Sequence, residues 1–118
     1  VTKEGLETAV ERSFGYEIPP LRDIYKIGVQ GHFDSSCQET VPWALRCFLE
    51  SSSFEDAIRK AVMARGDTDT KACICGAIAE AYYDVPDHLY NKACSYLEKD
   101  MLDVIVQYCN HMQNEIDS

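Results

Sequence analysis

The sequence has few cationic side chains, no long apolar run and no closely paired cysteine motif. Its 118 residues hold 11 Lys and Arg against 20 Asp and Glu, a formal net charge of −9. Such a chain repels nucleic-acid phosphates and anionic lipid headgroups. No apolar run approaches the roughly 20 residues that a membrane-spanning helix needs. We therefore expect neither nucleic acid nor a membrane as a partner, and a cytoplasmic location.

The six cysteines include no Cys-x-x-Cys pair, and their spacings argue against both disulfides and a zinc site. The nearest pair, Cys73 and Cys75, lies in a stretch of helical periodicity, where side chains two positions apart do not face each other. The chain begins Val1-Thr2-Lys3-Glu4, without a basic and apolar secretory segment. We expect reduced, mostly buried thiols. We interpret the start at Val1 as the cut end of a fragment.

Hydrophobic residues make up 46% of the sequence, enough for a core, and the length fits one domain over residues 1–118. Apolar residues recur at helical spacing, and no window alternates long enough for a strand. The expected fold class is all-α. The first predicted helix covers 3–14, and the second begins at about Thr40 with Pro42 in its first turn. The third follows the capping-box pair Ser52 and Glu55 and ends at Arg65-Gly66. Three more are predicted over 71–83, from Val85-Pro86 onward, and around 101–112. One or two turns are expected over 21–27, and 28–37 is expected to be a loop.

The predicted helix over 71–83 carries small residues on nearly all sides, among them Ala72, Cys73, Gly76 and Ala77. A helix of this kind is typically packed closely by several neighbours. We therefore expect it to be the central helix of the bundle.

Three oxygen-bearing side chains, Asp67, Asp69 and Thr70, fall within four residues directly after Gly66. In a turn that enters a helix, these side chains can direct their oxygens toward one point. Carboxylate and hydroxyl oxygens suit Mg²⁺, Mn²⁺ or Ca²⁺. The alternative is that one of them caps the helix by accepting a backbone N–H. A cap needs only one such residue, and the excess favours a metal site.

No grouping of Ser, Cys and His suggests a nucleophile, so the catalytic residues are unknown.

Four stretches of the chain, in this order, resemble the C-terminal part of the ADP-ribosylglycohydrolase family, which includes the dinitrogenase reductase-activating glycohydrolases. They are Ser36-Cys37-Gln38-Glu39-Thr40-Val41-Pro42, Phe54-Glu55-Asp56-Ala57-Ile58-Arg59-Lys60-Ala61-Val62, Gly66-Asp67-Thr68-Asp69-Thr70 and Gly76-Ala77-Ile78-Ala79-Glu80-Ala81-Tyr82-Tyr83. The resemblance is strongest over 33–97.

The resemblance implies an orthogonal multi-helix bundle that holds two divalent ions, usually Mg²⁺, with Mn²⁺ possible. Asp67, Asp69 and Thr70 would form one ligand set, and a Thr-Asp-Asp run near the N-terminus of the complete enzyme would form the other. The implied function is metal-dependent removal of ADP-ribose from a modified protein or a related ADP-ribosyl compound, which would be the substrate partner. The ions would orient the hydroxyls of the distal ribose and a water that attacks its anomeric carbon.

The chain departs from the family pattern at several positions. It contains no Thr-Asp-Asp run, so we expect the isolated chain to be inactive or nearly so. Arg65, Glu39 and Asp84 stand where relatives commonly have glycine. The alternative is a non-catalytic helical fragment or interaction module with a vestigial metal loop. The surface left by the missing N-terminal half would then favour a homo-oligomer.

Overall fold

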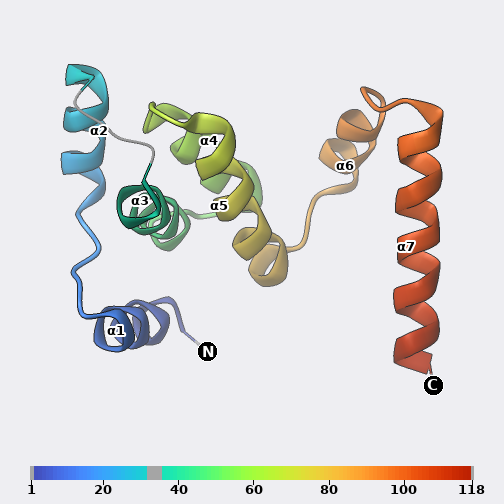
Figure 1. Ribbon diagram of the computed structural model, residues 1–118, viewed down its shortest axis with the longest axis horizontal. Helices are drawn as coiled ribbons and strands as arrows, with labels where there is room; N and C mark the ends of the chain where they lie inside the picture. The colour runs from blue at the N-terminus through green and yellow to red at the C-terminus, as the bar shows by residue number, and fades with distance from the viewer. Residues whose placement is uncertain (1, 32–35, 118) are drawn as a thin grey trace. The chain divides into compact units, whose positions relative to one another are not determined.

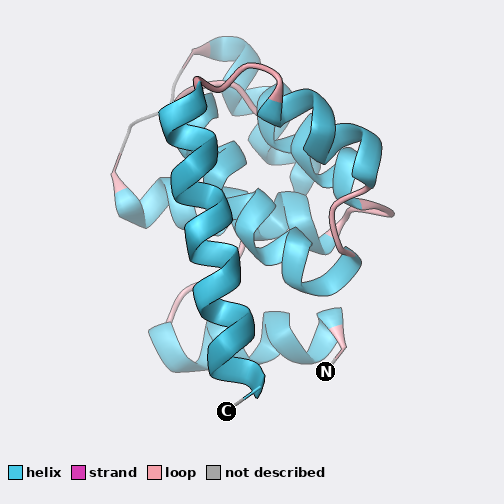
Figure 2. Ribbon diagram, turned by 90° about the vertical axis from the view of Figure 1, so that its right-hand side faces the viewer, coloured by secondary structure: helices cyan, strands magenta, loops and turns pink. Residues whose placement is uncertain are grey.

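The structure is a computed structural model that describes residues 2–31 and 36–117. These residues form seven α-helices and no strand, which confirms the all-α fold class (Figure 2). The helices are α1 (Lys3–Phe14), α2 (Leu21–Gln30), α3 (Cys37–Leu49), α4 (Phe54–Met63), α5 (Thr68–Tyr83), α6 (Asp87–Cys94) and α7 (Lys99–Asp117). The chain divides into two compact units, Val1–Asp84 and Val85–Ser118. The single domain over 1–118 stays a prediction.

The core of the first unit lies where α3, α4 and α5 pack side by side (Figure 1). Small side chains allow these helices to approach closely, and larger ones from α2 and α3 fill the remaining space. The buried cluster consists of Ile24, Trp43, Ala44, Cys47, Phe48, Ala57, Ala61, Ala64, Cys75 and Ala79. Ala64 of this cluster directly precedes the loop between α4 and α5.

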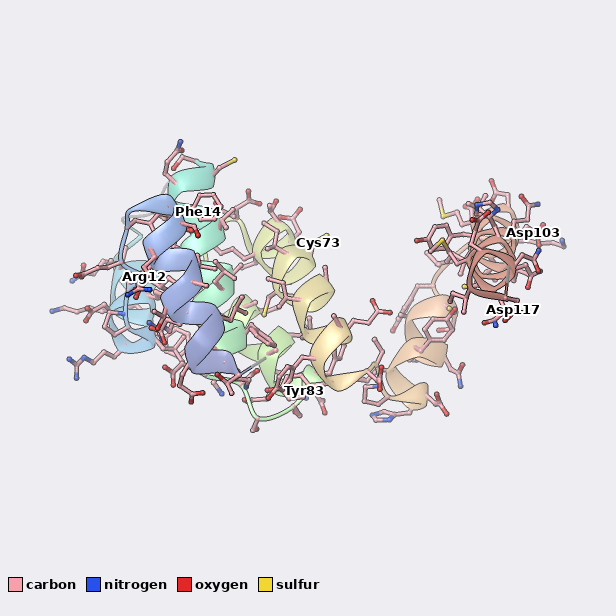
Figure 3. All side chains as sticks on the ribbon, turned by 90° about the horizontal axis from the view of Figure 1, so that it is seen from below. Arg12, Phe14, Cys73, Tyr83, Asp103 and Asp117 are labelled. Carbon is pink, nitrogen blue, oxygen red and sulfur yellow. The ribbon has the colours of Figure 1, made fainter. Side chains whose placement is uncertain are left out.

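Helix α5 is buried along one face rather than on several. Lys71, Cys75 and Ala79 follow one another at steps of four residues, and all are fully buried against α3 and α4. Cys73, labelled in Figure 3, and Ala77 lie on other faces of the helix and are exposed. Within this unit α5 thus has two close neighbours, α3 and α4.

Several helix boundaries differ from the prediction; α5, for example, begins at Thr68 and not at residue 71. Helix α2 continues to Gln30, so residues 28–30 are helical and not loop. Gly28 is buried there because α2 runs against the backbone of Ala64. Helix α3 begins at Cys37, which places Pro42 beyond its first turn. The predicted loop residues His32 and Asp34 lie outside the described residues.

The N-terminus of α4 is capped by Ser53, one residue later than predicted. Its side chain accepts a hydrogen bond from the Asp56 N–H at 3.0 Å. The Asp56 carboxylate accepts in return from the Ser52 N–H at 2.9 Å and from Lys60 Nζ at 2.7 Å. The hydrogen bond from Lys60, followed by that from Ser52, holds the pKa of the Asp56 carboxyl below its ordinary value of 3.8.

Replacing Asp56 with Asn is expected to lower the free energy of unfolding by about 1 kcal/mol at pH 7, through loss of the Lys60 pair and of a negative charge at a helix N-terminus. Because the folded-state pKa is lowered, this stabilisation is present above the unfolded-state pKa and is lost as the pH falls through the folded-state value. Urea unfolding at a series of pH values measures the difference. A gap between the two proteins that persists at low pH would contradict the assignment.

A buried arginine ties α1 and the following segment to α3. Arg46 Nε donates to the Pro19 carbonyl at 2.9 Å and its Nη2 donates to the Ile18 carbonyl at 3.0 Å. The same guanidinium pairs with Glu7 of α1 and, at 3.2 Å, with Glu50. The Arg46 side chain is 10% exposed, so these contacts are well shielded from water.

The thiols are less buried than predicted. Cys47 and Cys75 are buried, Cys94 is half-buried, and Cys37, Cys73 and Cys109 are exposed; all six are free. Burial raises the pKa of Cys47 to about 12 and that of Cys75 to about 11, which keeps both as unreactive thiols at neutral pH.

The second unit consists of α6 and α7. Helix α7 carries Leu102, Ile105, Cys109 and Met112 at alternating steps of three and four residues, the spacing of an amphipathic helix. Lys99 and Asp103 form an ion pair on its first turns at 3.0 Å. None of the described helices is both long and apolar enough to cross a bilayer.

Candidate metal centre

The loop between α4 and α5 reverses the chain through two residues of left-handed backbone. Ala64 caps α4, and Arg65 and Gly66 follow with φ of 63° and 78°. The Thr68 N–H then donates to the Gly66 carbonyl at 2.8 Å, and α5 begins at Thr68. Glycine takes this conformation without steric cost, whereas a side chain such as that of Arg65 raises its energy. The positive φ of Arg65 must therefore be stabilised by contacts with neighbouring residues.

This turn brings the side chains of Asp67 and Thr70 together. Thr70 Oγ1 donates to Asp67 Oδ1 at 2.8 Å, and the Thr70 N–H donates to Asp69 Oδ1 at 3.0 Å. Asp67 is half-buried, while Asp69 and Thr70 are exposed. All three predicted site residues thus lie on the first turn of α5, within reach of solvent.

Asp67 lies at the position of a helix cap, so the capping alternative stays a prediction. It occupies the N-cap position of α5, but its side chain makes no capping hydrogen bond to a backbone N–H. Its carboxylate accepts from the Thr70 hydroxyl instead. Hydrogen bonding with the Asp69 side chain, followed by that from Thr70, holds the pKa of the Asp67 carboxyl below its ordinary value. At neutral pH it therefore offers a charged oxygen.

The oxygens of Asp67, Asp69 and Thr70 fit a hard divalent cation in chemical type, and they account for part of a coordination shell. Mg²⁺ takes six oxygen ligands and commonly keeps several waters among them. Across residues 2–31 and 36–117 there is no group of three or more His, Cys, Asp or Glu side chains that could hold a metal ion. A complete two-ion site would need further ligands.

One residue that supports this loop was not singled out from the sequence. Lys71 follows Thr70, is fully buried, and donates from Nζ to the Arg65 carbonyl at 2.9 Å. Its ammonium lies 4.0 Å from the centroid of the Trp43 ring. The available signal was its position in the buried series with Cys75 and Ala79, where a charged residue is unusual.

The described helices form an all-α protein with oxygen-bearing side chains at the N-terminus of α5, and the comparison with protein families identifies its family. The model of the ADP-ribosylglycohydrolase family matches residues 2–115, so the chain belongs to this family. The match supports an ADP-ribosylglycohydrolase-like function in general. No curated protein and no solved structure matches the chain.

Two positions at which the resemblance leads us to expect glycine have unusual backbone. They are Arg65 and Asp84, the non-glycine residues with positive φ among the described residues, at 63° and 64°. They lie just before and just after α5. A positive φ, which glycine adopts without steric cost, thus occurs at a non-glycine residue beside each end of this helix.

Proposed function

We propose that this chain contributes one ligand set of a metal-dependent hydrolase that removes ADP-ribose from a modified protein or a related ADP-ribosyl compound. The observation that carries the proposal is the convergence of Asp67 and Thr70, at 2.8 Å, in a member of the ADP-ribosylglycohydrolase family. Two negative carboxylates and a neutral hydroxyl on one helical turn suit Mg²⁺, or Mn²⁺ in its place.

In this proposal the three side chains bind the metal ion and fix its position. Asp67 and Asp69 supply charge, and Thr70 supplies a neutral oxygen whose hydroxyl proton is already directed at Asp67. When bound, a pair of divalent ions would polarise a water and align the ribose hydroxyls. The rigid first turn of α5 keeps the three donors in fixed relation, which lowers the cost of ordering them around an ion.

The remaining ligands must come from elsewhere in this proposal. We assign them to a Thr-Asp-Asp segment of a longer protein, which would seat on the exposed side of α5 around Cys73 and Ala77. The isolated chain would then bind metal weakly and show little or no hydrolysis.

Titration of the chain with MgCl₂ by calorimetry tests the proposal. We expect binding with a dissociation constant on the order of 1 mM, because half of the charged ligands are lacking. Asp67→Asn should weaken it at least about tenfold. Asp103→Asn, which removes an exposed helical carboxylate of α7, should leave it unchanged. Binding that survives Asp67→Asn would contradict the site, and tight binding of two ions would contradict its division.

The alternative is an interaction module with a vestigial metal loop. The observation in its favour is the exposed Arg65, a cation two residues before Asp67. In that case the chain would bind no Mg²⁺, and the open side of α5 would drive association of copies. Sedimentation at a series of concentrations distinguishes a dimer from a monomer, and addition of Mg²⁺ would leave the result unchanged.

A further inference from the structure

We infer that Lys71 is a positioning residue of the metal loop: its buried ammonium holds the Arg65 carbonyl, and thereby the turn that brings Asp67 and Thr70 together. The inference deepens the proposed function, and its metal readout rests on it. Lys71 itself does not touch the proposed ion.

The contacts of Lys71 reach back around the whole turn. Its backbone N–H donates to the Asp67 carbonyl at 3.0 Å, and its Nζ donates to the Arg65 carbonyl at 2.9 Å. A single residue thus holds the Arg65–Gly66 and the Asp67–Thr68 peptide groups. The first of these bonds is ordinary helix geometry, whereas the second requires a side chain of this length with a donor at its end.

The ammonium is set in place by the core. It lies 4.0 Å from the centroid of the Trp43 ring, and Trp43 is 4% exposed in the middle of α3. A desolvated cation over an indole face is a favourable contact, and it offsets part of the cost of burying the charge. Because Trp43 is packed among the core side chains, its contact with Nζ fixes where the ammonium lies. The ammonium in turn holds the Arg65 carbonyl.

The turn needs such an anchor. Arg65 takes a φ of 63°, which is costly for any residue with a Cβ. A hydrogen bond to its own carbonyl stabilises that conformation against relaxation to an ordinary φ. Without it we expect the turn to sample other conformations, so that Asp67 and Thr70 no longer converge for most of the time.

Lys71→Met keeps the length and apolar stem of the side chain but removes the donor. The first readout is trypsin cleavage of the native chain after Arg65, compared with cleavage after Arg59 within α4. We expect cleavage after Arg65 to rise about tenfold while that after Arg59 changes little. General destabilisation would instead raise both together. Lys60→Met is the matched control, since Lys60 pairs with Asp56 away from the turn.

The second readout is the affinity for MnCl₂, measured from the electron paramagnetic resonance signal of the free ion. Lys71→Met should weaken binding about tenfold, the usual effect of removing a group that orients metal ligands. In an Arg65→Gly background the same change should matter less, because glycine adopts the turn unaided. Lys71→Arg, which retains a donor, should preserve protection at Arg65 if it folds.

The outcomes separate the two proposals. If the unmodified chain binds no Mn²⁺ while Lys71→Met exposes Arg65 selectively, the proposed function fails and the anchoring of the turn stands. If the unmodified chain binds Mn²⁺ and Lys71→Met changes neither its affinity nor the ratio of cleavage at Arg65 to that at Arg59, the positioning role is overturned.

Discussion

Gly28→Ala is expected to lower the free energy of unfolding by about 3 kcal/mol. A Cβ at this position would lie 2.3 Å from the carbonyl oxygen of Ala64, a backbone atom that is held in the buried cluster. Either α2 must move away from α4 or the end of α4 must shift. The sign is informative, because alanine in place of glycine within a helix ordinarily stabilises it by about 0.5–1 kcal/mol.

Urea unfolding followed by circular dichroism measures this effect. Gly5→Ala is the matched control, since Gly5 also lies in a helix but is exposed, and a Cβ there meets the hydroxyl of the exposed Thr2 side chain at 3.0 Å and no backbone atom. Because Ala64 directly precedes Arg65, we also expect Gly28→Ala to weaken metal binding. A Gly28→Ala chain as stable as the parent would show that α2 does not approach α4 as described.

Arg46→Met should cost about 3 kcal/mol of stability, the lower end of the range for breaking a shielded ion pair, because Glu7 is 30% exposed. The substitution keeps most of the apolar stem but removes the donors to the Ile18 and Pro19 carbonyls. It also leaves Glu7 without its cation. The loss should fall on the attachment of α1 and the segment after it.

The free energy of unfolding from urea titration tests the magnitude, and amide hydrogen exchange tests the location. We expect exchange to accelerate in α1 more than in α4. Arg59→Met, which breaks the exposed pair with Glu55, should change stability by less than about 0.5 kcal/mol. If the two substitutions changed stability equally, the Arg46 ion pair would contribute no more than an exposed surface pair. That result would contradict its role in attaching α1 to α3.

The helices could be predicted from the sequence because their apolar spacing is local information. The extent of α2 could not, because Gly28 and Gly31 indicate a loop when only neighbours in sequence are considered. Gly28 lies against the backbone of Ala64, 36 positions later in the chain, where a side chain would not fit. The predicted cap of α4 was wrong by one residue for a related reason. Both Ser52 and Ser53 precede an acidic residue by three positions, so the sequence pattern does not distinguish them. In the structure the Asp56 N–H donates to Ser53, and the Asp56 carboxylate accepts from the Ser52 N–H.

The candidate site was only partly predictable. Asp67, Asp69 and Thr70 stand out by their density of oxygen atoms, and the family resemblance gave them a role. Lys71 did not stand out, because a lysine beside polar residues is normally solvated. Its burial depends on Trp43 and on the bend at Arg65, and neither the aromatic contact nor the φ of an arginine can be deduced from residue types alone.

The sequence contains a single tryptophan, and the structure places it against the Lys71 ammonium, which donates to the Arg65 carbonyl. Its emission therefore reports on one known location, without any label. A shift in intensity or wavelength on adding a divalent ion would come from the junction of α3 and α5. The protein thus carries its own optical probe, and stopped-flow mixing with an ion could follow how quickly this turn responds.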